Sequence, residues 1–286
     1  MKIDLLGDLF MKIGFQGETG AYSEDAAIQF FKDKKIELVS FYRLEDVFKA
    51  VINKKVDFGI IPVENSTYGF VLLAWDLLRM YNVRIYAETI LRIVHCLIAL
   101  PGAKLSNIRY IYSHPQALGQ CKAFLNKLHD VEIIPAYDIA GSIMLIKREY
   151  LYNVATIASK RAARAYKMEI LAEGIDSSKN NYMRFFIIGL KDRGLTGNDK
   201  TTIIFSTLHK PGALYNALRS FAENKVNITA IMSRPITDRP WEYYFFMDIE
   251  GHYKEEKVQS AIAGLHKHST FVKVIGSYPK AYTSYV

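Results

Sequence analysis

Three short polar segments contain the side chains best suited to chemistry. They are Glu64–Thr67, Ser113–Gln116 and Asn180–Arg184, each at the expected carboxyl end of a strand. Loops at the carboxyl ends of parallel strands meet at one edge of a sheet. Backbone amides at helix starts, together with the guanidinium of Arg184, can hold a carboxylate. Each segment alone is also typical of capping and turns. Together they predict a pocket for an acidic small molecule.

The composition argues against several other kinds of site. The seven histidines are scattered, without a second ligand at helical or hairpin spacing, so no metal is expected. Gly14–Gly17 resembles a dinucleotide-binding turn only loosely, so no cofactor is expected either. Lys and Arg outnumber Asp and Glu by 37 to 29, and this excess is spread along the chain. Such a distribution argues against nucleic-acid binding; it is compatible with acidic ligands and with a role in solubility alone.

Cysteine content and hydropathy favour a reduced compartment. Only Cys96 and Cys121 occur, so a disulfide framework cannot form, and we expect a cytoplasmic protein. The most apolar run, Ile90–Leu100, is interrupted by Arg92 and His95 and is too short to span a bilayer. We therefore expect no membrane association.

Short strands and helices alternate through the first two thirds of the chain. Strands are expected at 12–15, 38–41, 58–63, 108–112, 131–135, 154–158 and 182–189, and an apolar run covers 90–100. This pattern predicts an α/β fold with parallel or mixed sheets in two lobes around a cleft, one lobe at 11–87 with 176–190 and the other at 88–175. Residues 1–10 lack the features of a signal peptide and are expected to be an extension before Met11.

A change of composition at residues 191–200 predicts a linker to a second domain at 201–286. Its expected order is strand, helix, strand, strand, helix, strand, a βαββαβ ferredoxin-like sandwich. We expect one face of its sheet and its edge strands to expose apolar side chains, namely Ile203, Phe205, Ile228 and Phe245. A second copy would cover them, which predicts a homodimer or homotetramer.

Several motifs resemble those of the prephenate dehydratase family, in order and in spacing. They are GETGAYSEDAA (17–27), VENSTYG (63–69) with DLL (76–78), SHPQALGQC (113–121), ASKRAARAY (158–166) and NNYMRF (180–185). The C-terminal motifs KPGALYNAL (210–218) and MSRP (232–235) resemble the ACT regulatory domain, which in that family follows the catalytic part and binds phenylalanine.

The resemblance implies a cofactor-free and metal-free conversion of prephenate to phenylpyruvate, by decarboxylation and dehydration, in phenylalanine biosynthesis. It implies a catalytic domain at 11–190 with a periplasmic-binding-protein-like cleft, and feedback regulation by phenylalanine. The catalytic residues it implies are Ser113, His114, Met183, Arg184 and Phe185. The substrate-binding residues are Glu64, Asn65, Ser66, Gln116, Ala117 and Asn181. The phenylalanine-binding residues are His209, Gly212, Ala213, Leu214, Asn227, Ser233, Arg234 and Pro235.

This chain departs from the family pattern at four positions. Met183 stands where the family has a threonine held to be the proton donor or its organiser, and a thioether cannot donate a hydrogen bond. Phe70, Ala74 and Met232 stand in place of the usual serine, threonine and glutamate. One interpretation moves the donor role to Ser113, His114 or Tyr182. The alternatives are non-aromatising decarboxylation of prephenate, action on arogenate, or ligand binding without turnover.

Overall fold

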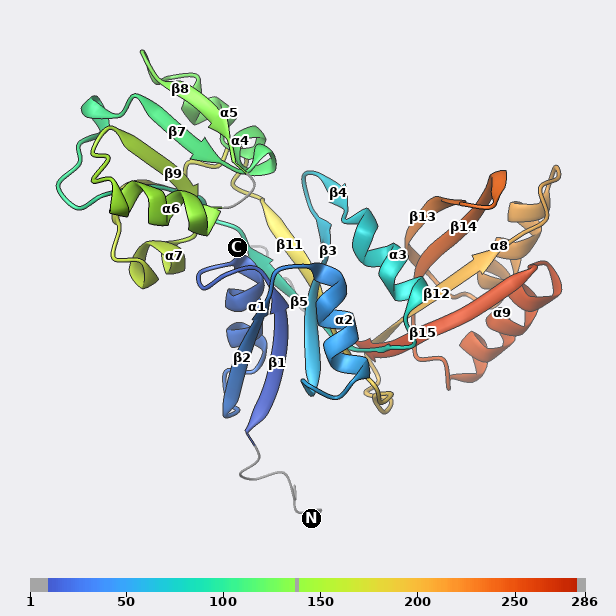
Figure 1. The fold of residues 1–286 in the computed structure, drawn as a ribbon. Helices are drawn as coiled ribbons and strands as arrows, with labels where there is room; N and C mark the ends of the chain where they lie inside the picture. The colour runs from blue at the N-terminus through green and yellow to red at the C-terminus, as the bar shows by residue number, and fades with distance from the viewer. Residues whose placement is uncertain (1–9, 137–138, 282–286) are drawn as a thin grey trace. The chain divides into compact units, whose positions relative to one another are not determined.

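The computed structural model describes residues 10–136 and 139–281 (Figure 1). The predicted extension, residues 1–10, lies outside this range except for its last residue. No helix among the described residues is both long and apolar enough to cross a membrane.

The first sheet contains β2 (Ile36–Phe41), β1 (Met11–Gln16), β3 (Phe58–Asn65), β11 (Tyr182–Gly189) and β5 (Arg84–Arg92), in that order, and the short β4 (Gly69–Phe70) pairs with β3. The connecting helices are α1 (Tyr22–Phe30), α2 (Leu44–Ile52) and α3 (Leu72–Met80). β1 and β2 pair in parallel, as a crossover through a helix requires. β11 is distant in sequence, yet it lies between β3 and β5. The predicted return of residues 182–189 to the first sheet is therefore confirmed.

The second sheet has the order β10 (Glu169–Glu173), β6 (Cys96–Ala99), β9 (Val154–Ala158), β7 (Tyr110–Ser113) and β8 (Glu132–Pro135). β7 is parallel to β8 and β9, whereas β6 is antiparallel to β9 and β10, so this sheet is mixed. Its helices are α4 (Pro115–Gln120), α5 (Lys122–Leu125), α6 (Ile139–Arg148) and α7 (Lys160–Ala165), with a 3-10 turn at Leu105–Asn107. Alternate residues of β6 enter separate apolar cores on its two faces.

The third sheet is antiparallel and has the order β13 (Ile228–Ile236), β14 (Arg239–Glu250), β12 (Asp199–Ser206) and β15 (Phe271–Pro279). α8 (Ala213–Glu223) follows β12 and α9 (Glu256–Lys267) follows β14. The predicted βαββαβ order is therefore confirmed.

The prediction that this sheet leaves an apolar face uncovered is wrong. Ile203 and Phe205 are fully buried in a core that α8 and α9 share with the sheet, and Phe245 stacks on Phe205 with ring centroids 5.2 Å apart. On the opposite face, Phe246 packs against Trp75 of α3 with ring centroids 5.5 Å apart. The helices of this chain supply the cover that a second copy was expected to provide.

The described chain forms two compact units. The first unit comprises the residues up to Leu44, Glu64–Phe70 and Ile90–Phe185. The second comprises Glu45–Val63, Val71–Thr89 and the residues from Phe186 onward.

Candidate active site

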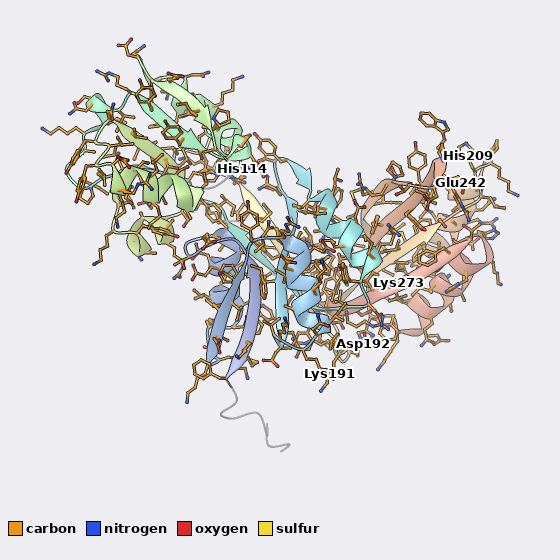
Figure 2. The ribbon with its side chains drawn as sticks, viewed as in Figure 1. His114, Lys191, Asp192, His209, Glu242 and Lys273 are labelled. Carbon is orange, nitrogen blue, oxygen red and sulfur yellow. The ribbon has the colours of Figure 1, made fainter. Side chains whose placement is uncertain are left out.

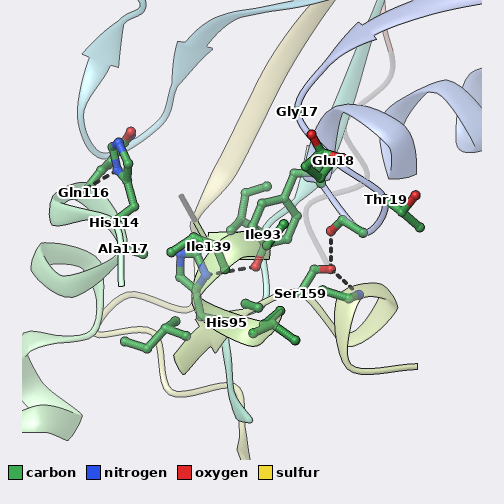
Figure 3. Close-up of a pocket in the computed structure, with 18 of the residues that line it drawn as sticks. Gly17, Glu18, Thr19, Ile93, His95, His114, Gln116, Ala117, Ile139 and Ser159 are labelled. Carbon is green, nitrogen blue, oxygen red and sulfur yellow. Dashed lines mark hydrogen bonds between the residues drawn. The ribbon is translucent and has the colours of Figure 1, made fainter. Parts of the chain in front are cut away.

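The first unit contains a cavity of about 410 Å³ (Figure 3). Its lining comes from the loop after β1, the end of β3, the connection between β5 and β6, the starts of α4 and α6, the end of β9 with α7, and β11. Segments that are distant in sequence thus share one cavity, as loops around a ligand site do.

The loop after β1 packs against the start of α7. Gly20 has a φ of +91°, and a Cβ at this position would lie 2.5 Å from the Cα of Ala162. Ser159, the N-cap of α7, donates its hydroxyl to the Gly20 carbonyl oxygen at 2.6 Å and accepts the Ala162 amide at 2.9 Å. Only glycine permits both the backbone conformation and this approach.

Asn65 lines the cavity and also organises the loop that follows β3. Its Oδ1 accepts the amides of Thr67 and Tyr68, each at 3.0 Å, and its Nδ2 donates to Asn181 Oδ1 at 2.9 Å and to the Tyr182 carbonyl at 3.2 Å. Ser66 Oγ donates to the Asn180 carbonyl at 2.8 Å. The amide of Asn65 is therefore occupied in joining two of the predicted polar segments.

The start of α4 supplies three of the predicted residues to the lining, His114, Gln116 and Ala117. His114 is the N-cap, and its Nδ1 accepts the amide hydrogen of Gln116 at 3.3 Å. Burial lowers the pKa of His114, so its imidazole is neutral at neutral pH and carries its proton on Nε2. His114 can therefore act as a neutral hydrogen-bond donor.

The segment Asn180–Arg184 lies at the start of β11, so the prediction that it sits at the carboxyl end of a strand is wrong. Among residues 183–185, Met183 alone contributes its side chain to the lining. Arg184 is largely buried, and its guanidinium lies 3.3 Å from Glu64 Oε2. Phe185 belongs to the buried core. Ser113 is also fully buried and donates its hydroxyl to the Ile157 carbonyl at 3.3 Å.

Of the eleven residues predicted for catalysis and substrate binding, five line the cavity, namely Asn65, His114, Gln116, Ala117 and Met183.

Sequence reasoning missed a group of cavity residues around His95. Its Nδ1 lies 2.9 Å from the Tyr22 hydroxyl, and its Nε2 lies 2.6 Å from Gln120 Oε1. Figure 3 shows His95 at the cavity wall. The sequence signal that could have identified His95 is its place within the apolar run Ile90–Leu100, where a polar side chain is unusual.

The cavity combines apolar walls with neutral polar groups. Ile93, Ile139 and Ile157 contribute to the walls. Among the described lining residues, Glu18 is the one carboxylate, and Lys and Arg are absent. A ligand carboxylate would therefore have to be held by amides, hydroxyls and imidazoles rather than by a direct ion pair with Lys or Arg.

The second unit contains a smaller cavity of about 150 Å³ at the start of α8. Three of the predicted phenylalanine-binding residues, His209, Ala213 and Leu214, line it together with Glu242, Tyr243 and Phe245. Figure 2 shows His209 and Glu242 close together at this place. Gly212 is the N-cap of α8 and has a φ of +78°.

The other residues predicted to bind phenylalanine do not line this cavity. Asn227 donates its side-chain amide to Glu250 at 3.3 Å. Arg234 pairs with Asp76 of α3 through two contacts, of 3.1 and 2.6 Å. Ser233 and Pro235 lie on the edge strand β13.

Comparisons with known proteins show to which family this chain belongs. The model of the prephenate dehydratase family matches residues 13–193. A bifunctional chorismate mutase/prephenate dehydratase of Aquifex aeolicus is 36% identical over 272 residues, covering 95% of this chain and 74% of the relative. The chain belongs to the prephenate dehydratase family.

Solved structures also resemble this prephenate dehydratase family member. A prephenate dehydratase of Arthrobacter aurescens, solved in complex with L-Phe, gives a TM-score of 0.86 at 29% identity and covers 94% of this chain and 90% of its own. A structure described as a novel type of quorum quenching acylase gives a TM-score of 0.84 at 28% identity, covering 94% of this chain and 97% of its own. Since one fold can carry different reactions, the reaction has to be argued from the cavity.

Of the departures from the family pattern, Met183 bears most directly on that cavity. Phe70 lies in β4, Ala74 is buried in α3 and Met232 lies on β13; none of these three lines it. Met183 does. Among these four departures, Met183 is therefore the one whose side chain lines the cavity.

Proposed function

We propose that this chain converts prephenate to phenylpyruvate, with loss of carbon dioxide and water, in phenylalanine biosynthesis. The observation that carries the proposal is the convergence of residues from five family motifs, among them Asn65, His114 and Met183, on one cavity. In this proposal residues 11–190 form the two-lobed, periplasmic-binding-protein-like catalytic domain, 191–200 a linker, and 201–286 an ACT regulatory domain.

The chemistry of prephenate fits the character of this cavity. The substrate is a dianion, and its ring becomes aromatic when the ring carboxylate leaves as carbon dioxide and the ring hydroxyl leaves with a proton. His114 and Gln116, at the start of α4, can present N–H groups to the pyruvyl carboxylate. The apolar walls at Ile93, Ile139 and Ile157 would leave the ring carboxylate poorly hydrated, which favours its loss.

The thioether at position 183 makes two alternative functions possible. Without a donor there, the same cavity could release carbon dioxide without forming an aromatic ring, or could bind its ligand without turnover. Arogenate, which differs from prephenate in carrying an amine on the side chain, is the third alternative. Each requires the same binding surface, so product identity separates them.

The test is to incubate the purified protein with prephenate, and separately with arogenate, without added metal or nucleotide. Formation of phenylpyruvate from prephenate, followed by its absorbance in alkali, is the expected result. A dihydro product would assign a non-aromatising decarboxylase, and faster formation of phenylalanine from arogenate would assign an arogenate dehydratase. Absence of any product from either substrate would refute the enzymatic function.

We further propose that phenylalanine binds in the cavity at the start of α8 and lowers activity. The N-terminal amides of α8 can hold its carboxylate, and Leu214 and Phe245 offer apolar contacts to its ring. We expect Ala213→Leu, which fills this cavity, to weaken binding at least tenfold. Calorimetric titration with L-phenylalanine measures this, with D-phenylalanine as the control ligand. Equal heats for the wild type and the variant would place the effector elsewhere.

We also propose self-association through the edge strand β13, since Ile203 and Phe205, which were expected to form the contact, are buried. β13 ends the strand order, and its Ile231 is 42% exposed. An edge of this kind can pair with the same edge of a second copy. Light scattering at micromolar concentration should give two or four times the mass of one chain. The mass of a single chain would contradict the proposal.

A further inference from the structure

A chain of buried hydrogen bonds lies behind one wall of the large cavity. Asp176 accepts the backbone amide of His95 at 2.8 Å and the side-chain amide of Asn181 at 3.0 Å. Asn181 in turn accepts from Asn65 at 2.9 Å. The His95 side chain is only 5% exposed, and its Nε2 lies 3.9 Å from Asp176 Oδ1. These bonds hold the backbone of His95 beside Asp176.

Tyr22 contacts this network and lines the cavity together with His95 and Asn65. Its hydroxyl lies 3.0 Å from the Val94 carbonyl oxygen and 2.9 Å from His95 Nδ1, two acceptors for its one proton, and its ring meets that of His95 edge to face. The Tyr22 side chain lines the same cavity as Met183. One lining residue thus carries a hydroxyl, which position 183 lacks, and two partners fix that hydroxyl.

The protonation state of Tyr22 suits a donor. Burial, followed by the charge of Asp176, raises the pKa of Tyr22 well above its ordinary value. The hydroxyl therefore keeps its proton at neutral pH, and its removal by solvent is disfavoured. Gln120 Oε1 can only accept, so it orients Nε2–H of His95 and leaves Nδ1 facing Tyr22.

We infer that Tyr22 supplies the proton to the departing ring hydroxyl, with His95 as the residue that positions Tyr22. This inference rests on the proposed function. The C–O bond breaks and its electrons leave with the oxygen, which takes the Tyr22 proton and departs as water. The bond to the ring carboxylate breaks at the same stage, its electrons complete the aromatic ring, and carbon dioxide leaves. One proton from solvent then returns the Tyr22 phenolate to its neutral form, which completes the proton balance of the turnover.

The experiment compares kcat and KM for phenylpyruvate formation in the wild type and in Tyr22→Phe. We expect kcat to fall about 100-fold or more, within the range for loss of a positioned acid, while KM changes less than about threefold. Tyr152→Phe removes the same atom from an exposed tyrosine outside the cavity lining, and should leave both constants unchanged. His95→Gln keeps a hydrogen-bonding side chain behind Tyr22, so a smaller fall in kcat is expected.

A second comparison keeps the inference testable if Tyr22→Phe loses stability. Met183→Thr is introduced into both the wild type and Tyr22→Phe. If Tyr22 replaces the missing threonine, Met183→Thr should raise kcat by a larger factor in the Tyr22→Phe background, because the two hydroxyls serve one role. Equal factors, or a Tyr22→Phe kcat within twofold of the wild type, would overturn the inference and leave the proposed function intact. A wild type that forms no phenylpyruvate would instead overturn the proposed function, and the inference with it.

Discussion

Met183→Thr should raise the rate of phenylpyruvate formation at least tenfold. A positioned general acid contributes roughly 10²- to 10⁴-fold to such reactions, and a threonine hydroxyl at this place would add a donor to a wall that now presents a thioether. The full factor is not expected, because Tyr22 already supplies part of it. Steady-state kinetics with prephenate measures the change in kcat.

Met183→Val is the matched control, because valine has the shape of threonine without its hydroxyl. Both variants remove the same methionine volume, so any gain from a roomier cavity appears in both. If the hydroxyl is what raises the rate, kcat for phenylpyruvate formation should be higher in Met183→Thr than in Met183→Val. Equal rates for the two variants, with unchanged thermal unfolding, would mean that a hydroxyl at position 183 does not take part in proton transfer.

The sequence was a good guide to the arrangement of strands because periodicity and turn residues are local signals. The alternation up to residue 190 predicted two α/β sheets, and the order βαββαβ was readable after residue 200. The sequence did not reveal which helices cover each face of the third sheet. Trp75 and Phe246 meet across a long stretch of chain, and nothing local to either residue indicates the contact.

The site was predictable where a residue directly follows a strand or starts a helix. His114, Gln116 and Ala117 illustrate this, since an N-cap and the first turn of a helix face the same loop edge. Arg184 and Phe185 lie in β11, which is almost wholly buried, so alternation could not show which of its side chains faces a ligand. The expected bidentate donor Arg184 is instead paired with Glu64.

Tyr22 and His95 could not be paired from one sequence. They are 73 residues apart, in an early motif and in an apolar run, and each taken alone is ordinary for its surroundings. Only the packing of the start of α1 beside the connection from β5 to β6 brings them within hydrogen-bond distance. Position-specific chemistry of this kind depends on tertiary contacts that composition and spacing do not encode.

Filling the large cavity should abolish the formation of phenylpyruvate from prephenate. Ala117 lies in the first turn of α4, beside His114 and Gln116, and its side chain lines the cavity (Figure 3). Ala117→Phe would place a ring where we expect the substrate, and a misplacement of even about 1 Å can cost 100-fold in rate. Ala123→Phe adds the same ring at an exposed position just beyond α4 and does not touch the cavity, so it is the matched control.

Whether prephenate reacts in this cavity is tested most directly by kcat/KM for phenylpyruvate formation. It is measured for the wild type, Ala117→Phe and Ala123→Phe. Thermal unfolding of each protein shows that the fold is retained. We expect measurable turnover by the wild type and by Ala123→Phe, and a loss of at least 100-fold in Ala117→Phe. Turnover by Ala117→Phe equal to that of the wild type would contradict this expectation, because the reaction would then take place elsewhere.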